Sequence, residues 1–274
     1  MDSTYDGTEG TYDGTEGLSY HTRMTPFLLS FVATILSALA SRWLTPLFFS
    51  TYRSAPHKVK REWDTRYACH IYAMTVVPFT LATLFDIFSS RDDESSVVSF
   101  ADYRTRTIMA TSLGYFLAEM FVCCVYEVGG VAMMVHHVTA IAVLSVAVLH
   151  DLGHVYILSV LITEITTPFV NMRWWLDKAG MKRTRLYLAN GLAMTVLWSL
   201  FRVALFPVYF AFVLHTWRHI CEVVPFPYRL LSIFPPLVLS YLNWSWFLLI
   251  LRGARKAIIT THSTHSTHSA HSTN

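Results

Sequence analysis

Seven long apolar runs, separated by shorter polar segments, restrict this chain more than any other feature of its sequence. At a rise of about 1.5 Å per residue, each run can cover most or all of a hydrocarbon core about 30 Å thick. The chain is therefore predicted to be an all-α, polytopic membrane protein with about seven transmembrane helices. The runs comprise residues 26–49, 67–88, 107–126, 131–149, 154–175, 186–214 and 230–251.

The composition agrees with a membrane protein. Hydrophobic residues make up 53% of the chain and charged residues only 14%, whereas a soluble domain carries about 25% charged residues. The aromatic content of 15% fits Trp and Tyr side chains at the membrane interfaces. A net charge of +3 is too small to indicate nucleic-acid binding, so that class of partner is excluded.

The two ends of the chain differ from its apolar centre. Residues 1–25 contain an acidic, glycine-rich repeat that cannot bury much apolar surface, so a disordered tail is predicted there. Residues 26–50 form an extra N-terminal span, and residues 63–251 form the main domain. Residues 252–274 are predicted to be a cytosolic low-complexity tail, whose histidines could bind metal but are more simply compositional bias.

The distribution of Lys and Arg predicts the orientation. With seven spans, one side of the membrane receives residues 50–66, 127–130, 173–185 and the C-terminal tail, which together carry 13 Lys and Arg. The other side carries 6. The positive-inside rule then predicts a luminal N-terminus and a cytosolic C-terminus.

Several polar side chains lie inside the predicted spans, where hydrocarbon would reject them. A charge at the bilayer centre costs about 2.5 to 3.5 kcal/mol, so such residues normally face a protein-lined interior. Their positions along the spans all fall in the cytosolic half, which predicts a shared cavity open toward the cytosol. The set comprises His70, Glu119, His136, His137, Glu164 and Asn171.

The fifth span adds two geometric predictions. Glu164, Thr167 and Asn171 recur at helical spacing and should share one face. Pro168 lacks the backbone N–H that would meet the Glu164 carbonyl, so that carbonyl is predicted to be free. In the fourth span, His136 and His137 lie about 100 degrees apart, so one should face the cavity and the other a neighbouring helix.

Structural alternatives remain open for these residues. Glu164 could be protonated, or paired with a histidine or an arginine to fix helix packing. Glu119 and Arg202 could form a charge-compensating pair, and the cysteines could simply be packing residues. Asn243 begins an Asn-Trp-Ser glycosylation sequon inside the last apolar run, where we expect it to be unused.

The segments HHVTAIA, ITEITTPFVNMRWWL and ANGLAMTVLWSLFRVALFP, with EWDTRYACH upstream, resemble the TLC (TRAM/Lag1/CLN8) domain family. Within that family, they resemble the group of TLC domain-containing protein 4 (transmembrane protein 56). The resemblance implies a six-helix TLC-type barrel around a lipid-accessible cavity, preceded here by one extra helix, and residence in the endoplasmic reticulum.

The resemblance also implies a role in membrane lipid metabolism or homeostasis. Ceramide synthases of this family use a histidine pair, matched here by His136 and His137, to transfer an acyl group from acyl-CoA to a sphingoid base. This chain lacks their D-x-S-D segment after the pair, and it has Glu119 where many relatives have Asp.

Three functional hypotheses follow. The first is an intramembrane acyl-lipid site; the second is an acyl-CoA-dependent acyltransferase acting on a sphingoid base or lysolipid; the third is a non-enzymatic lipid sensor or cargo-binding protein. Neither a cofactor nor a metal is expected. The predicted catalytic residues are His136, His137 and Glu164, with His70, Glu119, Thr167, Asn171, Arg173 and Arg202 as lipid-binding or supporting residues.

Overall fold

The computed structural model describes residues 14–90 and 97–271, with side chains described for residues 22–90 and 97–255. Every regular element in this part of the chain is a helix, which confirms the all-α prediction. Among the shorter elements, η1 and η3 are 3-10 helices and η2 is a π-helix. The elements are α1 (Gly14–Phe48), α2 (Ser50–Ser54), α3 (His57–Ser90), α5 (Tyr103–Tyr126), α6 (Gly130–His150), α7 (His154–Leu161), η1 (Ile162–Thr166), α8 (Thr167–Lys178), α9 (Arg185–Trp198), η2 (Ser199–Ala204), α10 (Leu205–His215), α11 (Trp217–Val223), α12 (Phe226–Arg229), η3 (Leu230–Ser232) and α13 (Phe234–His271).

Seven helical segments among the described residues are long and apolar enough to cross a membrane, as predicted. Three of these spans are composite. The fifth consists of α7, η1 and α8, the sixth of α9, η2 and α10, and the seventh includes α12, η3 and α13. The breaks in the fifth and sixth spans lie beside the polar residues described below.

The first and last helices are longer than predicted. Helix α1 begins at Gly14, inside the segment 1–25 that we expected to be disordered, and α13 continues through most of the predicted tail to His271. Once an apolar segment has formed a helix, each added residue contributes one more backbone hydrogen bond, so a helix can extend into polar sequence. Residues 1–13 and 272–274 lie outside the described part of the chain.

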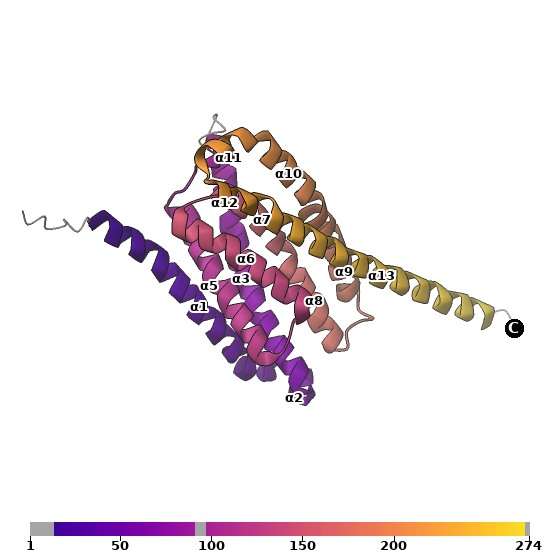
Figure 1. Cartoon of the computed structure of the whole chain (residues 1–274). Helices are drawn as coiled ribbons and strands as arrows, with labels where there is room; N and C mark the ends of the chain where they lie inside the picture. The colour runs from indigo at the N-terminus through magenta and orange to yellow at the C-terminus, as the bar shows by residue number, and fades with distance from the viewer. Residues whose placement is uncertain (1–13, 91–96, 272–274) are drawn as a thin grey trace, which may run out of the picture.

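Successive spans run in alternating directions (Figure 1), which gives the bundle two ends. We call them the α2 end, which carries α2, the α5–α6 turn and the α8–α9 connection, and the α11 end, which carries the α6–α7 turn, α11 and α12. The buried hydrophobic core is formed chiefly by α3, α5, α6 and α7. Helix α1 packs along α5 and α3 on the outside of this core.

At the α11 end, Asp151 joins three spans. It caps α6 in the left-handed conformation, and its carboxylate accepts hydrogen bonds from Arg23 of α1 at 2.6 Å and from Arg106 of α5 at 3.0 Å. Arg23 also donates to the carbonyl of Val148 at 2.6 Å. The extra N-terminal helix is therefore fixed to the bundle at a defined height.

A glycine sets how closely α1 approaches α5. Gly114 of α5 lies against the backbone of α1 at Phe27, so that a Cβ atom at this position would collide with the Phe27 carbonyl oxygen. Backbone atoms cannot turn aside as a flexible side chain can, and overpacking a tight contact typically costs about 1 to 3 kcal/mol. The α1–α5 contact therefore depends on the missing side chain.

We expect Gly114→Ala to lower the thermal unfolding temperature of the detergent-purified protein, although alanine is the better helix former. Gly253→Ala is the matched control, because a Cβ at Gly253 in α13 would meet nothing within 4 Å. The control should unfold at the wild-type temperature or slightly above it. Equal unfolding temperatures for the two variants would contradict the close α1–α5 contact.

Candidate functional site

Two cavities meet inside the bundle. The first, which we call the polar chamber, has a volume of about 540 Å³ and lies toward the α2 end. The second, the apolar chamber, has a volume of about 100 Å³ and lies toward the α11 end. Phe116, His136 and Glu164 line both chambers, so the two are neighbours that share part of one wall. All lining residues come from the six later spans and their connections, which leaves α1 outside the barrel.

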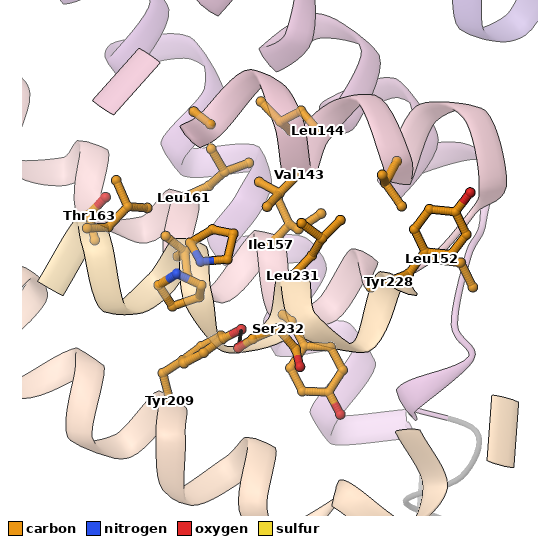
Figure 2. Close-up of a pocket in the computed structure, with 18 of the residues that line it drawn as sticks. Val143, Leu144, Leu152, Ile157, Leu161, Thr163, Tyr209, Tyr228, Leu231 and Ser232 are labelled. Carbon is orange, nitrogen blue, oxygen red and sulfur yellow. Dashed lines mark hydrogen bonds between the residues drawn. The ribbon is translucent and has the colours of Figure 1, made fainter. Parts of the chain in front are cut away.

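The apolar chamber is lined mainly by aliphatic and aromatic side chains. In Figure 2, Val143 of α6, Ile157 of α7 and Leu231 of η3 point toward one another across it. Tyr209 also lines the chamber. Its hydroxyl donates to the Ser232 carbonyl at 3.0 Å and so already has a hydrogen-bond partner. Away from the end that His136 and Glu164 line, this chamber offers hydrocarbon a mainly apolar surface.

Both histidines of the pair line the polar chamber, contrary to the prediction that only one would face a cavity. Their ring centroids are 5.6 Å apart and the rings are nearly perpendicular, at 89°. Phe116 of α5 packs against both rings, at 5.8 Å and 5.7 Å. Because the chamber is wide, two side chains 100 degrees apart on α6 can border it together. In the described residues, the Nδ1 atoms of both rings have no hydrogen-bond partner.

His136 occupies the boundary between the chambers. It is the histidine that also lines the apolar chamber, and its ring lies 6.1 Å from the ring of Trp246 on α13. A molecule extending from one chamber into the other would pass this imidazole.

The predicted shared face of the fifth span is confirmed: Glu164, Thr167 and Asn171 all line the polar chamber. The predicted free carbonyl is wrong. The backbone tightens into the 3-10 helix η1 before Pro168, and the Thr167 N–H donates to the Glu164 carbonyl. A 3-10 bond to the third residue replaces the α-helical bond that Pro168 cannot make.

Arg202 organises the centre of the site from the π-helix η2. Its guanidinium donates to Thr166 Oγ1 at 2.6 Å, to the Thr163 carbonyl at 3.1 Å and to Asn243 Oδ1 at 3.1 Å. It also forms an ion pair with Glu164 at 3.4 Å, and both side chains are more than nine-tenths buried. The arginine therefore joins the fifth, sixth and seventh spans. Its carboxylate partner is Glu164, so of the two pairings left open by the sequence, that of Glu164 with an arginine is confirmed and that of Arg202 with Glu119 is not formed.

The sequence interpretation missed Asn243 as a site residue. It is 2% exposed, and besides accepting from Arg202, its backbone carbonyl accepts from the Trp198 indole at 3.1 Å. The available signal was an amide side chain within an apolar run, which we interpreted only as part of a sequon.

Glu119 instead contacts two cysteines. Its Oε1 atom accepts from Cys69 of α3 at 3.2 Å and from Cys123 of α5 at 3.7 Å. All three side chains line the polar chamber, and Glu119 is 2% exposed. These two cysteines are thus part of the chamber wall, whereas the sequence indicated packing residues.

Arginine side chains border the polar chamber near the α2 end. Arg66 and Asn171 exchange two hydrogen bonds of 3.1 Å each, one from the Arg66 side chain and one to its backbone carbonyl. Arg173 lies over the Tyr187 ring at 4.1 Å and donates to the Tyr187 carbonyl at 3.3 Å. Gly191 on α9 leaves room for the Arg173 guanidinium. Two arginines thus border the polar chamber at this end, where Arg66 also pairs with Glu62 at 2.8 Å.

His70 does not join the other predicted site residues among those that line the chambers. Its ring lies 5.2 Å from the ring of Trp175 on α8. Because Cys69 faces the polar chamber, its neighbour on α3 must point about 100 degrees away. A supporting role for His70 would therefore act through the packing of α3 on α8.

No group of three His, Cys, Asp or Glu residues in the described part of the chain is arranged to hold a metal ion. The side chains of the histidine-rich tail lie outside the described residues.

These features define a class: a multi-pass membrane protein whose helical barrel encloses adjoining polar and apolar cavities. The family model for the TLC domain (TRAM, LAG1, CLN8) matches residues 62–252. The chain therefore belongs to the TLC domain family, as its sequence motifs predicted.

Animal proteins that are similar to this chain are also named TLC domain-containing proteins. The chain is 27% identical over 219 residues to TLC domain-containing protein 4-B of Danio rerio, covering 78% of this chain and 82% of that protein. It is 28% identical over 243 residues to TLC domain-containing protein 4-A of Xenopus laevis, covering 82% and 87%. It is 25% identical over 243 residues to TLC domain-containing protein 4 of Homo sapiens, covering 83% and 87%.

Proposed function

We propose that this protein binds a single acyl lipid, with its chain in the apolar chamber and its polar group in the polar chamber, and thereby acts in membrane lipid metabolism or homeostasis. The observation that carries the proposal is the shared wall: His136 and Glu164 border both chambers. An amphiphile whose chain occupies the apolar chamber would have its first polar atoms beside these two side chains.

Buried polar atoms without hydrogen-bond partners in the polar chamber also support a bound lipid headgroup. Burying a polar group without a hydrogen-bond partner costs free energy, so an empty polar chamber inside a membrane protein is unfavourable unless water or a ligand fills it. The Nδ1 atoms of His136 and His137 and the Oε2 atom of Glu119 lack partners among the described residues. A headgroup with hydroxyl, amide or ester groups would satisfy such atoms.

Acyl transfer is the second candidate function, and the paired imidazoles favour it. His136 or His137 would act as base or nucleophile at the carbonyl of an acyl thioester such as acyl-CoA, with a sphingoid base or lysolipid as acceptor. Glu164 already binds Arg202 and the Thr167 hydroxyl, the latter at 2.6 Å. Its role in that reaction would be to hold the fifth and sixth spans together rather than to orient a histidine.

The proposed setting is the endoplasmic reticulum membrane with the α2 end toward the cytosol. That end carries the segments with the excess of Lys and Arg. The polar chamber would then open toward the compartment that contains acyl-CoA, while the apolar chamber would lie in the luminal half of the membrane. A non-enzymatic sensor would use the same geometry without turnover.

Photocrosslinking tests the proposal. A lysolipid with a diazirine at the end of its acyl chain would be added to the purified protein and activated by light. The crosslinked peptides should contain the apolar-chamber residues Val143, Ile157 or Leu231. Crosslinks confined to outward-facing positions such as Val138, which is 57% exposed, would contradict it.

A further inference from the structure

The wall of the polar chamber also holds a thiol and carboxylate cluster, for which the proposed lipid site gives no chemical role to the thiol. Cys69 of α3 faces Glu119 of α5 across the helix interface, with its Sγ atom donating to Glu119 Oε1 at 3.2 Å. The other carboxylate oxygen of Glu119, Oε2, is buried and has no hydrogen-bond partner among the described residues. Both residues line the chamber. The carboxylate therefore accepts a hydrogen bond from the thiol through one oxygen, while its other oxygen has no partner among the described residues.

The neighbouring carboxylate could serve as the base that a nucleophilic thiol needs. The thiolate, and not the thiol, attacks a carbonyl carbon, so the thiol must lose its proton as it reacts. A carboxylate already in hydrogen-bond contact with that proton can accept it. A structural cysteine needs no such partner, because a buried thiol packs as a small hydrophobic group.

We propose that Cys69 is an acyl acceptor that forms a thioester with the acyl group of a long-chain acyl thioester bound in the chambers. This inference rests on the proposed function, because the chambers must first hold the acyl chain. The Cys69 sulfur forms a bond to the carbonyl carbon, and the bond from that carbon to the sulfur of the incoming thioester breaks.

The step balances without an oxidant or a reductant. The proton of Cys69 passes to Glu119 and then to the departing thiolate, which leaves as a free thiol. One thioester replaces another, so the acyl group keeps its reactivity and can be passed on to a hydroxyl, an amine or water. Cys69 would thus hold the acyl group between donor and final acceptor.

The other cysteines are less suited to this role. Cys123 lies farther from the same oxygen, at 3.7 Å, and is on the same helix as Glu119. Cys124 is exposed and contacts the Met134 sulfur at 3.8 Å. Cys221 of α11 is not among the residues that line either chamber. The geometry therefore points to one thiol.

The test uses the full-length protein in detergent, incubated with palmitoyl-CoA. Intact-mass spectrometry should show one added palmitoyl group, neutral hydroxylamine should remove it, and peptide mapping should place it on Cys69. Cys69→Ser should lose the adduct and Cys124→Ser should keep it. Glu119→Gln should slow its formation at least tenfold, because a positioned acid or base contributes typically 10²-fold or more.

Mapping in the wild-type protein locates the adduct even if Cys69→Ser fails to fold. An adduct on Cys123, or no adduct on any cysteine while the protein still retains the palmitoyl-CoA, would overturn the assignment of Cys69. Either result would leave the proposed lipid site uncontradicted. Failure to retain any acyl ligand would instead contradict the proposed function.

Discussion

Replacing Arg202 with methionine is expected to lower the free energy of unfolding by about 3 to 5 kcal/mol, the usual cost of removing one partner from a buried ion pair. The variant would leave Glu164 buried beside the chambers without its cation, and would also break hydrogen bonds to the fifth and seventh spans. Thermal or denaturant unfolding of the purified protein in detergent measures the effect.

Two further variants make this prediction specific. Arg202→Met combined with Glu164→Gln should recover part of the lost stability, because no unpaired buried charge remains. Arg218→Met is the matched control, since Arg218 is 88% exposed and its pair with Glu222 at 3.2 Å lies on the surface of α11. Such exposed pairs contribute at most about 1 kcal/mol. An Arg202→Met protein as stable as the control would contradict the buried network.

Placing a tryptophan in the apolar chamber is expected to abolish most lipid binding. Val143→Trp would add an indole to a cavity of about 100 Å³ between α6, α7 and η3, where an acyl chain is proposed to lie. We expect retention of a radiolabelled acyl lipid by the purified protein to fall at least tenfold. The matched control, Val138→Trp, changes an exposed position on the same helix.

The control separates the loss of the cavity from a general effect of tryptophan on α6. Val138→Trp should retain lipid at the wild-type level, and both variants should elute as a single folded species in size-exclusion chromatography. If the two variants retained lipid equally, the chain would not enter the apolar chamber.

The sequence predicted the spans well because crossing a membrane depends on properties that are local in sequence. Hydropathy and run length determine whether a segment can span, and both can be counted without knowing any neighbour. The shared face of Glu164 and Asn171 was predictable for the same reason, since helical spacing is also local. The motifs around His136 also indicated the TLC domain family.

Contacts between spans were harder to predict. Position along a helix shows the depth of a residue, but it does not show the direction in which the helix is turned around its own axis. The sequence therefore left open whether Arg202 pairs with Glu119 or an arginine pairs with Glu164; in the structure Arg202 pairs with Glu164, and Glu119 accepts from Cys69.

The 3-10 and π-helical segments could not be predicted from the sequence either. The proline at position 168 indicated a missing donor, but not that η1 would tighten and supply the Thr167 N–H instead. The π-helix around Arg202 contains no proline or glycine itself; Pro207 removes the donor for the Val203 carbonyl, but this does not indicate that the segment forms a π-helix. Both depend on how the neighbouring spans pack, which a single segment does not encode.

An experimental density map of the protein purified with a bound acyl lipid tests the central claim most directly. The two chambers should contain one continuous elongated density, which runs from Val143 and Leu231 past His136 and ends in a headgroup near Glu119 and Arg66. Lipid density found only on the outer surface of the barrel, with the space between His136 and Leu231 filled by repacked side chains, would contradict it.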